Sequence, residues 1–154
     1  MIPAMFASVV LVLLTVGIHY EALRLTSDLL PKLTLPPRQR MIVVLVCVFA
    51  AHTVEVWIYG VAYLILDSQI GIGDFGGVIP GELPDYIYFS TVTYTSLGYG
   101  DVFPLGGLRL VTGVESLNGL LLIGWSASFT YLAMQEVWGL HKELEQARRA
   151  RRRA

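Results

Sequence analysis

Three apolar stretches, each long enough to cross a lipid bilayer, constrain the fold of this chain more than any other feature. They run from about Pro3 to Leu23, from about Met41 to Leu66 and from about Leu108 to Trp138. A transmembrane helix needs about 20 predominantly apolar residues. Charged residues make up 15% of the chain, whereas soluble domains contain about 25%. We therefore predict an all-α membrane protein of one domain with three transmembrane helices.

The basic residues predict which ends of these helices face the cytoplasm. All Lys and Arg residues except Arg109 lie either between the first and second stretches or in the C-terminal tail. Short loops rich in Lys and Arg remain in the cytoplasm. We therefore expect the C-terminus inside and the N-terminus outside the plasma membrane (the inner membrane of a bacterium), with residues 67–107 facing outward. The first stretch lacks a basic leading region, which favours a retained helix over a cleaved signal peptide.

A short helix precedes the third apolar stretch and is too short to cross the membrane. Gly71 to Gly81 is rich in Gly and Pro and indicates an outer loop. Pro84 and Asp85 then suit the first turn of a helix that runs to Thr95. Irregular backbone at membrane depth is tolerated only inside protein or beside water. The segment is therefore predicted to be a re-entrant pore helix.

The residues that follow carry the chemistry of the chain. The string from Tyr94 to Asp101 reads Tyr-Thr-Ser-Leu-Gly-Tyr-Gly-Asp. Glycine permits backbone conformations that other residues resist, so successive carbonyl oxygens can point toward one axis. Four such strands around the axis replace the hydration shell of a potassium ion. This string, with its flanking helices, resembles the pore domain of potassium channels over about residues 40 to 138.

The resemblance implies a role for each residue of the filter. The carbonyls of Ser96, Leu97, Gly98, Tyr99 and Gly100 would coordinate potassium ions, with no other cofactor. Ser96 stands where the family usually has threonine and Leu97 where it has valine, which bears on the strength of the innermost site. Thr95 and Asp101 would support the two ends of the filter. A carboxylate that pairs with this aspartate in some family members is replaced here by Val92.

The resemblance also implies the organisation of the chain. Residues 1–39 form the first helix and a cytoplasmic loop, and residues 139–154 form a basic cytoplasmic tail. The pore domain, residues 40–138, divides into an outer helix (41–66), a pore helix (84–95), the filter (96–100) and an inner helix (108–138). One strand cannot surround an ion, so we expect a homotetramer. The first helix is absent from two-helix channels and lacks the repeated Arg of a voltage sensor.

Two glycines lie within the predicted inner helix. Glycine destabilises a helix interior by about 1 kcal/mol relative to alanine, so Gly119 and Gly124 require a reason. The family resemblance implies a hinge near Gly119. Close packing of small residues between membrane helices explains them equally well, and the two interpretations are compatible.

Polar residues inside the apolar stretches form a second candidate site. His52 and Glu55 lie three residues apart, as do Glu115 and Asn118, so each pair shares one helical face. Such groups are costly within a membrane. We expect the four to form one polar cluster behind the filter, favoured as a hydrogen-bond network over a pH sensor. His52 and Glu55 alone lack the further ligands that a zinc site needs.

The sequence thus predicts a potassium-selective channel. The alternatives are a weakly selective cation channel, a pore subunit that needs a partner protein, and a non-conducting membrane protein of the same fold. An enzyme is not supported, because no nucleophile and base are paired, and no nucleic acid partner is expected. The basic tail would serve as a topological signal or attract anionic lipid.

Overall fold

The computed structural model describes residues 1–78 and 81–151, with side chains described as far as Gly139. The elements in chain order are α1 (Ile2–Leu29), a 3-10 turn (Leu30–Lys32), α2 (Pro37–Ile65), a π-helical turn (Leu66–Ile70), β1 (Phe75–Gly77), α3 (Leu83–Tyr94), β2 (Val102–Pro104) and α4 (Leu108–Arg151). Among these residues, three helical segments are long and apolar enough to span a membrane: Ile2–Lys32, Pro37–Ile70 and Leu108–Gly139. The predicted all-α membrane fold is confirmed.

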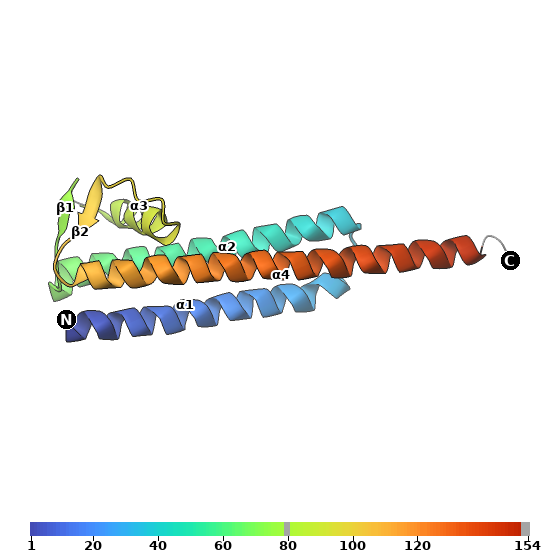
Figure 1. Cartoon of the computed structure of the whole chain (residues 1–154), viewed down its shortest axis with the longest axis horizontal. Coiled ribbons are helices and arrows are strands. Elements are labelled where there is room, and N and C mark those ends of the chain that lie inside the picture. Colours follow the sequence, from blue (N-terminus) through green and yellow to red (C-terminus); the bar gives the residue numbers. More distant parts are fainter. Residues whose placement is uncertain (79–80, 152–154) are drawn as a thin grey trace.

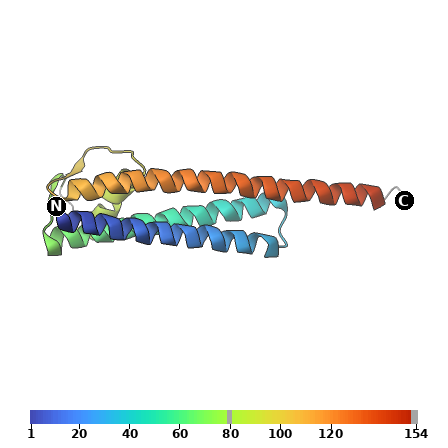
Figure 2. The ribbon, with the colours of Figure 1, turned by 60° about the horizontal axis from the view of Figure 1, so that its bottom comes forward.

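The three long helices lie side by side, and the short elements gather at one end of them (Figure 1). The N-terminus, α3 and the strands β1 and β2 are at this end, and the connection between α1 and α2 is at the other. α4 continues past that connection toward the C-terminus in both views (Figures 1 and 2). The pore-helix segment and the C-terminus are therefore at opposite ends of the bundle.

The first helix packs against α2 and α4 of its own chain. Its inward stripe is small or polar over much of its length, whereas large apolar side chains such as Phe6 and Leu13 are exposed. The buried residues are Ala4, Ser8, Leu11, Thr15, His19, Leu23 and Thr26. Small residues allow close approach of helices where lipid covers the outer face. α1 is thus an integrated part of the bundle.

The helices extend further than the apolar stretches predict. α1 continues to Leu29, and α2 begins at Pro37 rather than near Met41, because proline is compatible with the first helical turn. Between the two helices, Leu33 to Pro36 lies outside any helix. The basic residues of the tail beyond Gly139 have side chains outside the described residues.

The outer loop differs from the irregular segment that its composition predicts. β1 pairs antiparallel with β2, so that Phe75 is opposite Pro104 and Gly77 is opposite Val102. Gly77 has φ +85°, and a Cβ there would lie 2.0 Å from the Asp101 carbonyl oxygen. The loop before the pore helix is therefore pinned to the chain just after the filter, a long-range pairing that local composition does not encode.

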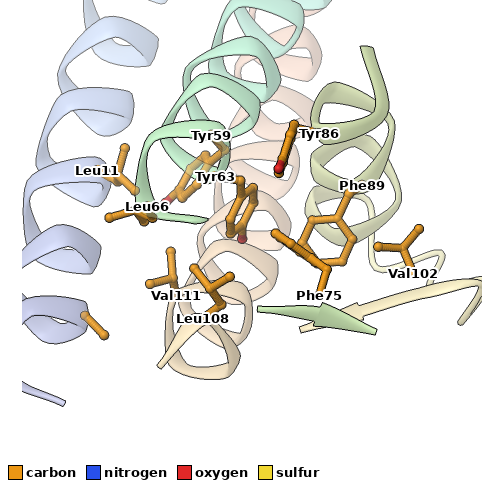
Figure 3. Close-up of a cluster of buried hydrophobic side chains, with 11 residues drawn as sticks. Leu11, Tyr59, Tyr63, Leu66, Phe75, Tyr86, Phe89, Val102, Leu108 and Val111 are labelled. Atoms are coloured by element: carbon orange, nitrogen blue, oxygen red, sulfur yellow. The ribbon is translucent and has the colours of Figure 1, made fainter. Parts of the chain in front are cut away.

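An aromatic core holds α3 against α2 and β1. The rings of Tyr63, Phe75 and Phe89 pack edge to face, with centroids 4.8 to 6.0 Å apart, and Tyr86 adjoins Phe75. Figure 3 shows these rings in the space between the two helices and the strands. Such pairs prefer this geometry, so the core fixes the position of the pore helix.

Candidate functional site: an ion pathway and a buried polar ring

The N-terminus of the pore helix is fixed by a capping box. The Asp85 carboxylate accepts hydrogen bonds from the backbone N–H of Gly81 (2.9 Å) and of Glu82 (3.1 Å). These bonds favour the ionised carboxyl and lower the pKa of Asp85. The next residue, Tyr86, donates to Asp67 at 2.5 Å. Burial and this bond raise the pKa of Tyr86 to about 12, so its hydroxyl remains a donor at ordinary pH.

The C-terminus of the pore helix fixes the start of the filter. The N–H groups of Thr95 and Ser96 donate to carbonyls of α3, and the N–H of Gly98 reaches back to the Val92 carbonyl at 3.1 Å. The Thr95 hydroxyl donates to the Thr91 carbonyl of the same helix. The filter therefore continues directly from the last turn of α3.

The filter backbone alternates in conformation. Ser96 (φ 57°), Gly98 (φ 55°) and Gly100 (φ 79°) have positive φ, and the residues between them do not. Ser96 is the one non-glycine residue with positive φ in the part of the chain that the structure describes. That conformation costs about 1–2 kcal/mol per residue. Alternation of this kind lets successive carbonyl oxygens face one side, which is the arrangement that a filter needs.

The side chain of Ser96 contacts the inner helix. Its hydroxyl lies 2.9 Å from the hydroxyl of Ser116 on α4. A hydroxyl has one donor and two acceptor positions, so this bond leaves Ser96 able to accept a further contact. Ser116 thereby anchors the inner end of the filter to α4.

The outer end of the filter is held by a tyrosine that sequence analysis missed. Tyr88 of α3 donates to the Asp101 carboxylate at 2.8 Å, and the bond raises the pKa of Tyr88. The Val78 N–H donates to the Asp101 carbonyl at 2.8 Å. Tyr88 lies four residues before Val92 and so on the same face of the helix. That spacing was the signal that a donor could take the place of the missing carboxylate.

A family profile described as "Ion channel" matches residues 41–136. The chain belongs to this ion channel family. The match covers more than half of the chain, from α2 through the filter into α4, and the resemblance to the two-helix pore family is confirmed. α1 lies outside the matched region.

Two curated proteins are similar to part of this channel. An "Uncharacterized membrane protein YdjJ" of Bacillus subtilis is 41% identical over 59 residues, which cover 38% of this chain and 17% of the relative. A "Putative potassium channel protein RPA4233" of Rhodopseudomonas palustris is 34% identical over 58 residues, or 37% of this chain and 14% of the relative. The matched part thus spans less than a fifth of either relative. No solved structure matches the chain.

The two glycines of the channel's inner helix have different surroundings. A Cβ at Gly119 would lie 2.2 Å from the Tyr94 carbonyl oxygen at the end of the pore helix. At Gly124 no atom lies within 4 Å of that position. α4 is a continuous helix through both residues. Gly119 therefore permits close packing of α4 on α3, and the hinge remains a prediction.

The predicted polar cluster is divided into separate networks, which corrects the expectation of one cluster. Glu115 accepts hydrogen bonds from Tyr63 of α2 and from Ser90 of α3, the latter at 2.6 Å. Asn118 donates to Thr15 of α1 at 2.9 Å. No hydrogen bond joins Glu115 or Asn118 to His52 or Glu55 among the described residues. Two carboxylates in one apolar interior repel each other, and each instead has its own donors.

The second network includes His19 of α1, which sequence analysis also missed. His19 Nδ1 lies 2.8 Å from Glu55 Oε1, and Tyr94 donates to Glu55 Oε2. The Tyr94 hydroxyl lies 2.8 Å from His52 Nδ1. Ser126 Oγ lies 3.0 Å from His52 Nε2 and 3.1 Å from His19 Nε2. We call these five side chains the polar ring. An ionisable residue within the first apolar stretch was the available signal.

The polar ring is a hydrogen-bonded network rather than an open cation site. His19 supplies a third potential metal ligand beside His52 and Glu55, and ligand atoms of the three side chains lie within 4.8 Å of one another. Hydrogen bonds within the ring already occupy both nitrogens of each histidine and both oxygens of Glu55. The geometry of the ring therefore supports a hydrogen-bond network rather than a metal site.

Proposed function

We propose that this protein is the pore-forming subunit of a potassium-selective channel in the plasma membrane, with the N-terminus outside and the C-terminus in the cytoplasm. Four copies would surround one axis, lined by the carbonyls of Ser96, Leu97, Gly98, Tyr99 and Gly100. The observation that carries the proposal is the alternation of positive φ at Ser96, Gly98 and Gly100. The name of the Rhodopseudomonas palustris relative agrees with it. Membership of an ion channel family indicates passive transport rather than enzymatic activity.

Exposure of the filter supports an oligomer. The side chains of Leu97 and Tyr99 are 56% and 67% exposed in the single chain. A groove of about 320 Å³ lies between the filter and α4, with Ser96, Gly98 and Ser116 in its lining. Apolar side chains next to an unfilled groove fit an interface between subunits. A closed ring of four chains is the assembly that completes an ion site from single strands.

The reversal potential of the reconstituted protein tests the proposal. Purified protein in a planar bilayer, with potassium on one side and sodium on the other, should reverse near the potassium equilibrium potential. A current that reverses near zero would support the weakly selective cation channel instead. Current that appears only after a co-purified protein is added would support the pore subunit with a partner. Anionic lipid in the bilayer tests the lipid interaction of the basic tail.

A glycine substitution within the filter should remove most of the potassium current. Gly98→Ala places a side chain at φ 55°, where glycine alone is unstrained. We expect the alanine to shift the backbone and misalign the carbonyls, so that potassium current falls below a tenth of the wild-type value, a loss equivalent to about 1.4 kcal/mol. Gly17→Ala is the matched control, because Gly17 is exposed on α1 with no atom near its Cβ position. Equal currents from the two variants would argue against this filter.

Removal of the Tyr88 hydroxyl should loosen the outer end of the filter. Tyr88→Phe deletes the donor to Asp101 and leaves the ring in place. The neutral phenol is the donor, and its pKa is raised in the fold. Its contribution is therefore complete below the ordinary tyrosine pKa of about 10 and is lost as the pH rises above it. We expect the variant to show a lower ratio of potassium to sodium permeability and to lose current faster during prolonged opening.

The control for this substitution is Tyr20→Phe, which removes a hydroxyl from an exposed tyrosine on α1. Tyr20→Phe should retain the wild-type permeability ratio. If Tyr88→Phe retains it as well, the bond to Asp101 does not hold the filter in its conducting form. Asp101→Asn provides a second measurement, since an amide can still accept from Tyr88 while the charge is lost.

A further inference from the structure

The polar ring joins the helices α1, α2, α3 and α4 at one point. His19 belongs to α1, His52 and Glu55 to α2, Tyr94 to α3, and Ser126 to α4. Each member contacts the next in the order His19, Glu55, Tyr94, His52, Ser126 and back to His19. His19 and Glu55 are fully buried. The ring is closed. Its member on the pore helix, Tyr94, is the last residue of α3 and lies two residues before the filter.

The hydrogen atoms of this ring can be counted. Five contacts each need one hydrogen between their two heavy atoms. A neutral histidine carries one N–H, and serine and tyrosine carry one O–H each, whereas an ionised carboxylate carries none. Two neutral histidines, Ser126, Tyr94 and ionised Glu55 therefore supply four hydrogens for five contacts. In that state one of the five contacts has no hydrogen, and the lone pairs of its two atoms face each other.

The missing hydrogen belongs to one of the three contacts made by His52 and Ser126. Tyr94 donates its hydroxyl hydrogen to Glu55 Oε2, since an ionised carboxylate can only accept. Glu55 Oε1 then accepts a hydrogen bond from the N–H at His19 Nδ1. The single N–H of a neutral His52 donates either to Tyr94 or to Ser126. The single Ser126 hydroxyl hydrogen can serve only one of the two histidines that it contacts. A further contact of 3.2 Å between His52 Nδ1 and Glu55 Oε2 can share a hydrogen but supplies none.

The charge of the ring also indicates that one proton is missing. Ionised Glu55 with two neutral histidines has a net charge of −1 in an apolar interior, which is costly without a compensating charge. One added proton completes the fifth contact and makes the ring neutral. It can reside on a histidine, as an imidazolium beside the carboxylate, or on Glu55 itself.

We propose that the polar ring is a binding site for one proton, and that this proton fastens α1 and α4 to the end of the pore helix. With the proton bound, each of the five contacts of the ring has one hydrogen. When it is lost at alkaline pH, one of the three contacts made by His52 and Ser126 opens, and the hydrogen bond that it provides between two helices is lost. The site makes the conducting pore dependent on a helix that the matched family region does not include.

The neighbouring titratable groups do not supply the missing hydrogen. Tyr59 of α2 and Glu115 of α4 lie close enough to influence the ring. Glu115 has its own donors in Tyr63 and Ser90, and the Tyr59 hydroxyl is joined to Asn118 at 3.3 Å. On the α1 side, His19 packs against the ring of Trp125, with centroids 5.5 Å apart. The proton therefore belongs to the polar ring itself.

Nuclear magnetic resonance of the full chain in lipid vesicles tests the proposal. The protein is labelled with ¹⁵N in histidine and ¹³C in the glutamate carboxyl. His141→Asn removes the one other histidine of the chain, and Glu55→Gln assigns the carboxyl. At neutral pH we expect either one imidazolium shared by His19 and His52 or a protonated Glu55, and loss of that proton at alkaline pH. Two neutral histidines together with an ionised Glu55 at neutral pH would overturn the proposal.

A serine substitution tests the hydrogen count. Ser126→Ala leaves three contacts in the sequence His19, Glu55, Tyr94, His52, and the remaining side chains supply three hydrogens without an added proton. We expect proton affinity to fall about tenfold, since a bond to a charged group is lost. Ser128→Ala is the matched control, because this exposed hydroxyl donates only to the Gly124 carbonyl of its own helix.

Equal proton affinity in Ser126→Ala and Ser128→Ala would show that closure of the ring does not bind the proton, and would overturn the proposal. The wild-type spectra decide the question even if Ser126→Ala fails to fold. Neither measurement depends on ion current, so their outcome is separate from that of the proposed function. The alkaline dependence of potassium flux through the wild type is the functional counterpart.

Discussion

Gly119→Ala is expected to destabilise the channel strongly, whereas Gly124→Ala, five residues further along the same helix, is expected to be tolerated. The added Cβ at Gly119 would lie 2.2 Å from the carbonyl oxygen and 3.0 Å from the carbonyl carbon of Tyr94. Backbone atoms cannot rotate away as a flexible side chain can. The helices must separate, and overpacking of this kind costs about 1–3 kcal/mol. At Gly124 the Cβ meets open space, and alanine favours the helix by about 1 kcal/mol.

Thermal unfolding in detergent and potassium flux into vesicles, measured on both variants, separate packing from hinge motion. Packing at Gly119 predicts a lower unfolding temperature and a disturbed filter, because Tyr94 precedes Ser96 by two residues. A hinge alone predicts that Gly119→Ala folds as stably as the wild type but conducts less. Equal unfolding temperatures for Gly119→Ala and Gly124→Ala would contradict the packing role of Gly119.

The sequence predicted those parts of the fold that depend on local pattern. Apolar length indicated the three long helices, and Pro84 and Asp85 indicated the start of the pore helix near Leu83. Gly98 and Gly100 indicated unusual backbone conformations in the filter, whereas the positive φ of Ser96 was not predicted. Each of these signals acts within a few residues, where helix capping, backbone freedom and membrane thickness dominate.

The parts that were missed depend on contacts between distant segments. β1 and β2 pair across the whole pore helix, and a run of Gly and Pro gives no sign of that pairing. Glu55 and Glu115 both lie within apolar stretches, but their donors, His19 and Tyr63, determine that they belong to separate networks. The role of Tyr88 could be inferred only from the absence of a carboxylate at Val92, which leaves Asp101 in need of another hydrogen-bond donor.

His19 links the least expected helix to the pore, and its removal is the second large effect that we predict. His19→Leu retains an apolar side chain of similar size but leaves Glu55 Oε1 without its donor in a fully buried position. Leaving a buried polar group without its hydrogen-bond partner costs about 1–3 kcal/mol, and more where the group is ionised. We expect a loss of that size in the free energy of unfolding, measured with denaturant in detergent micelles. Tyr20→Leu, the neighbouring exposed position, is the control.

The double variant His19→Leu/Glu55→Leu distinguishes a broken polar pair from lost packing. Replacement of both partners by apolar groups removes the orphaned carboxylate, and such replacements are often close to neutral. In this variant His52 retains its contacts with Tyr94 and with Ser126. The double variant should therefore recover about 2 kcal/mol or more relative to His19→Leu. If its loss of stability equals the sum of the losses in the two single variants, the bond between His19 and Glu55 contributes no specific coupling, and α1 is held by its other contacts.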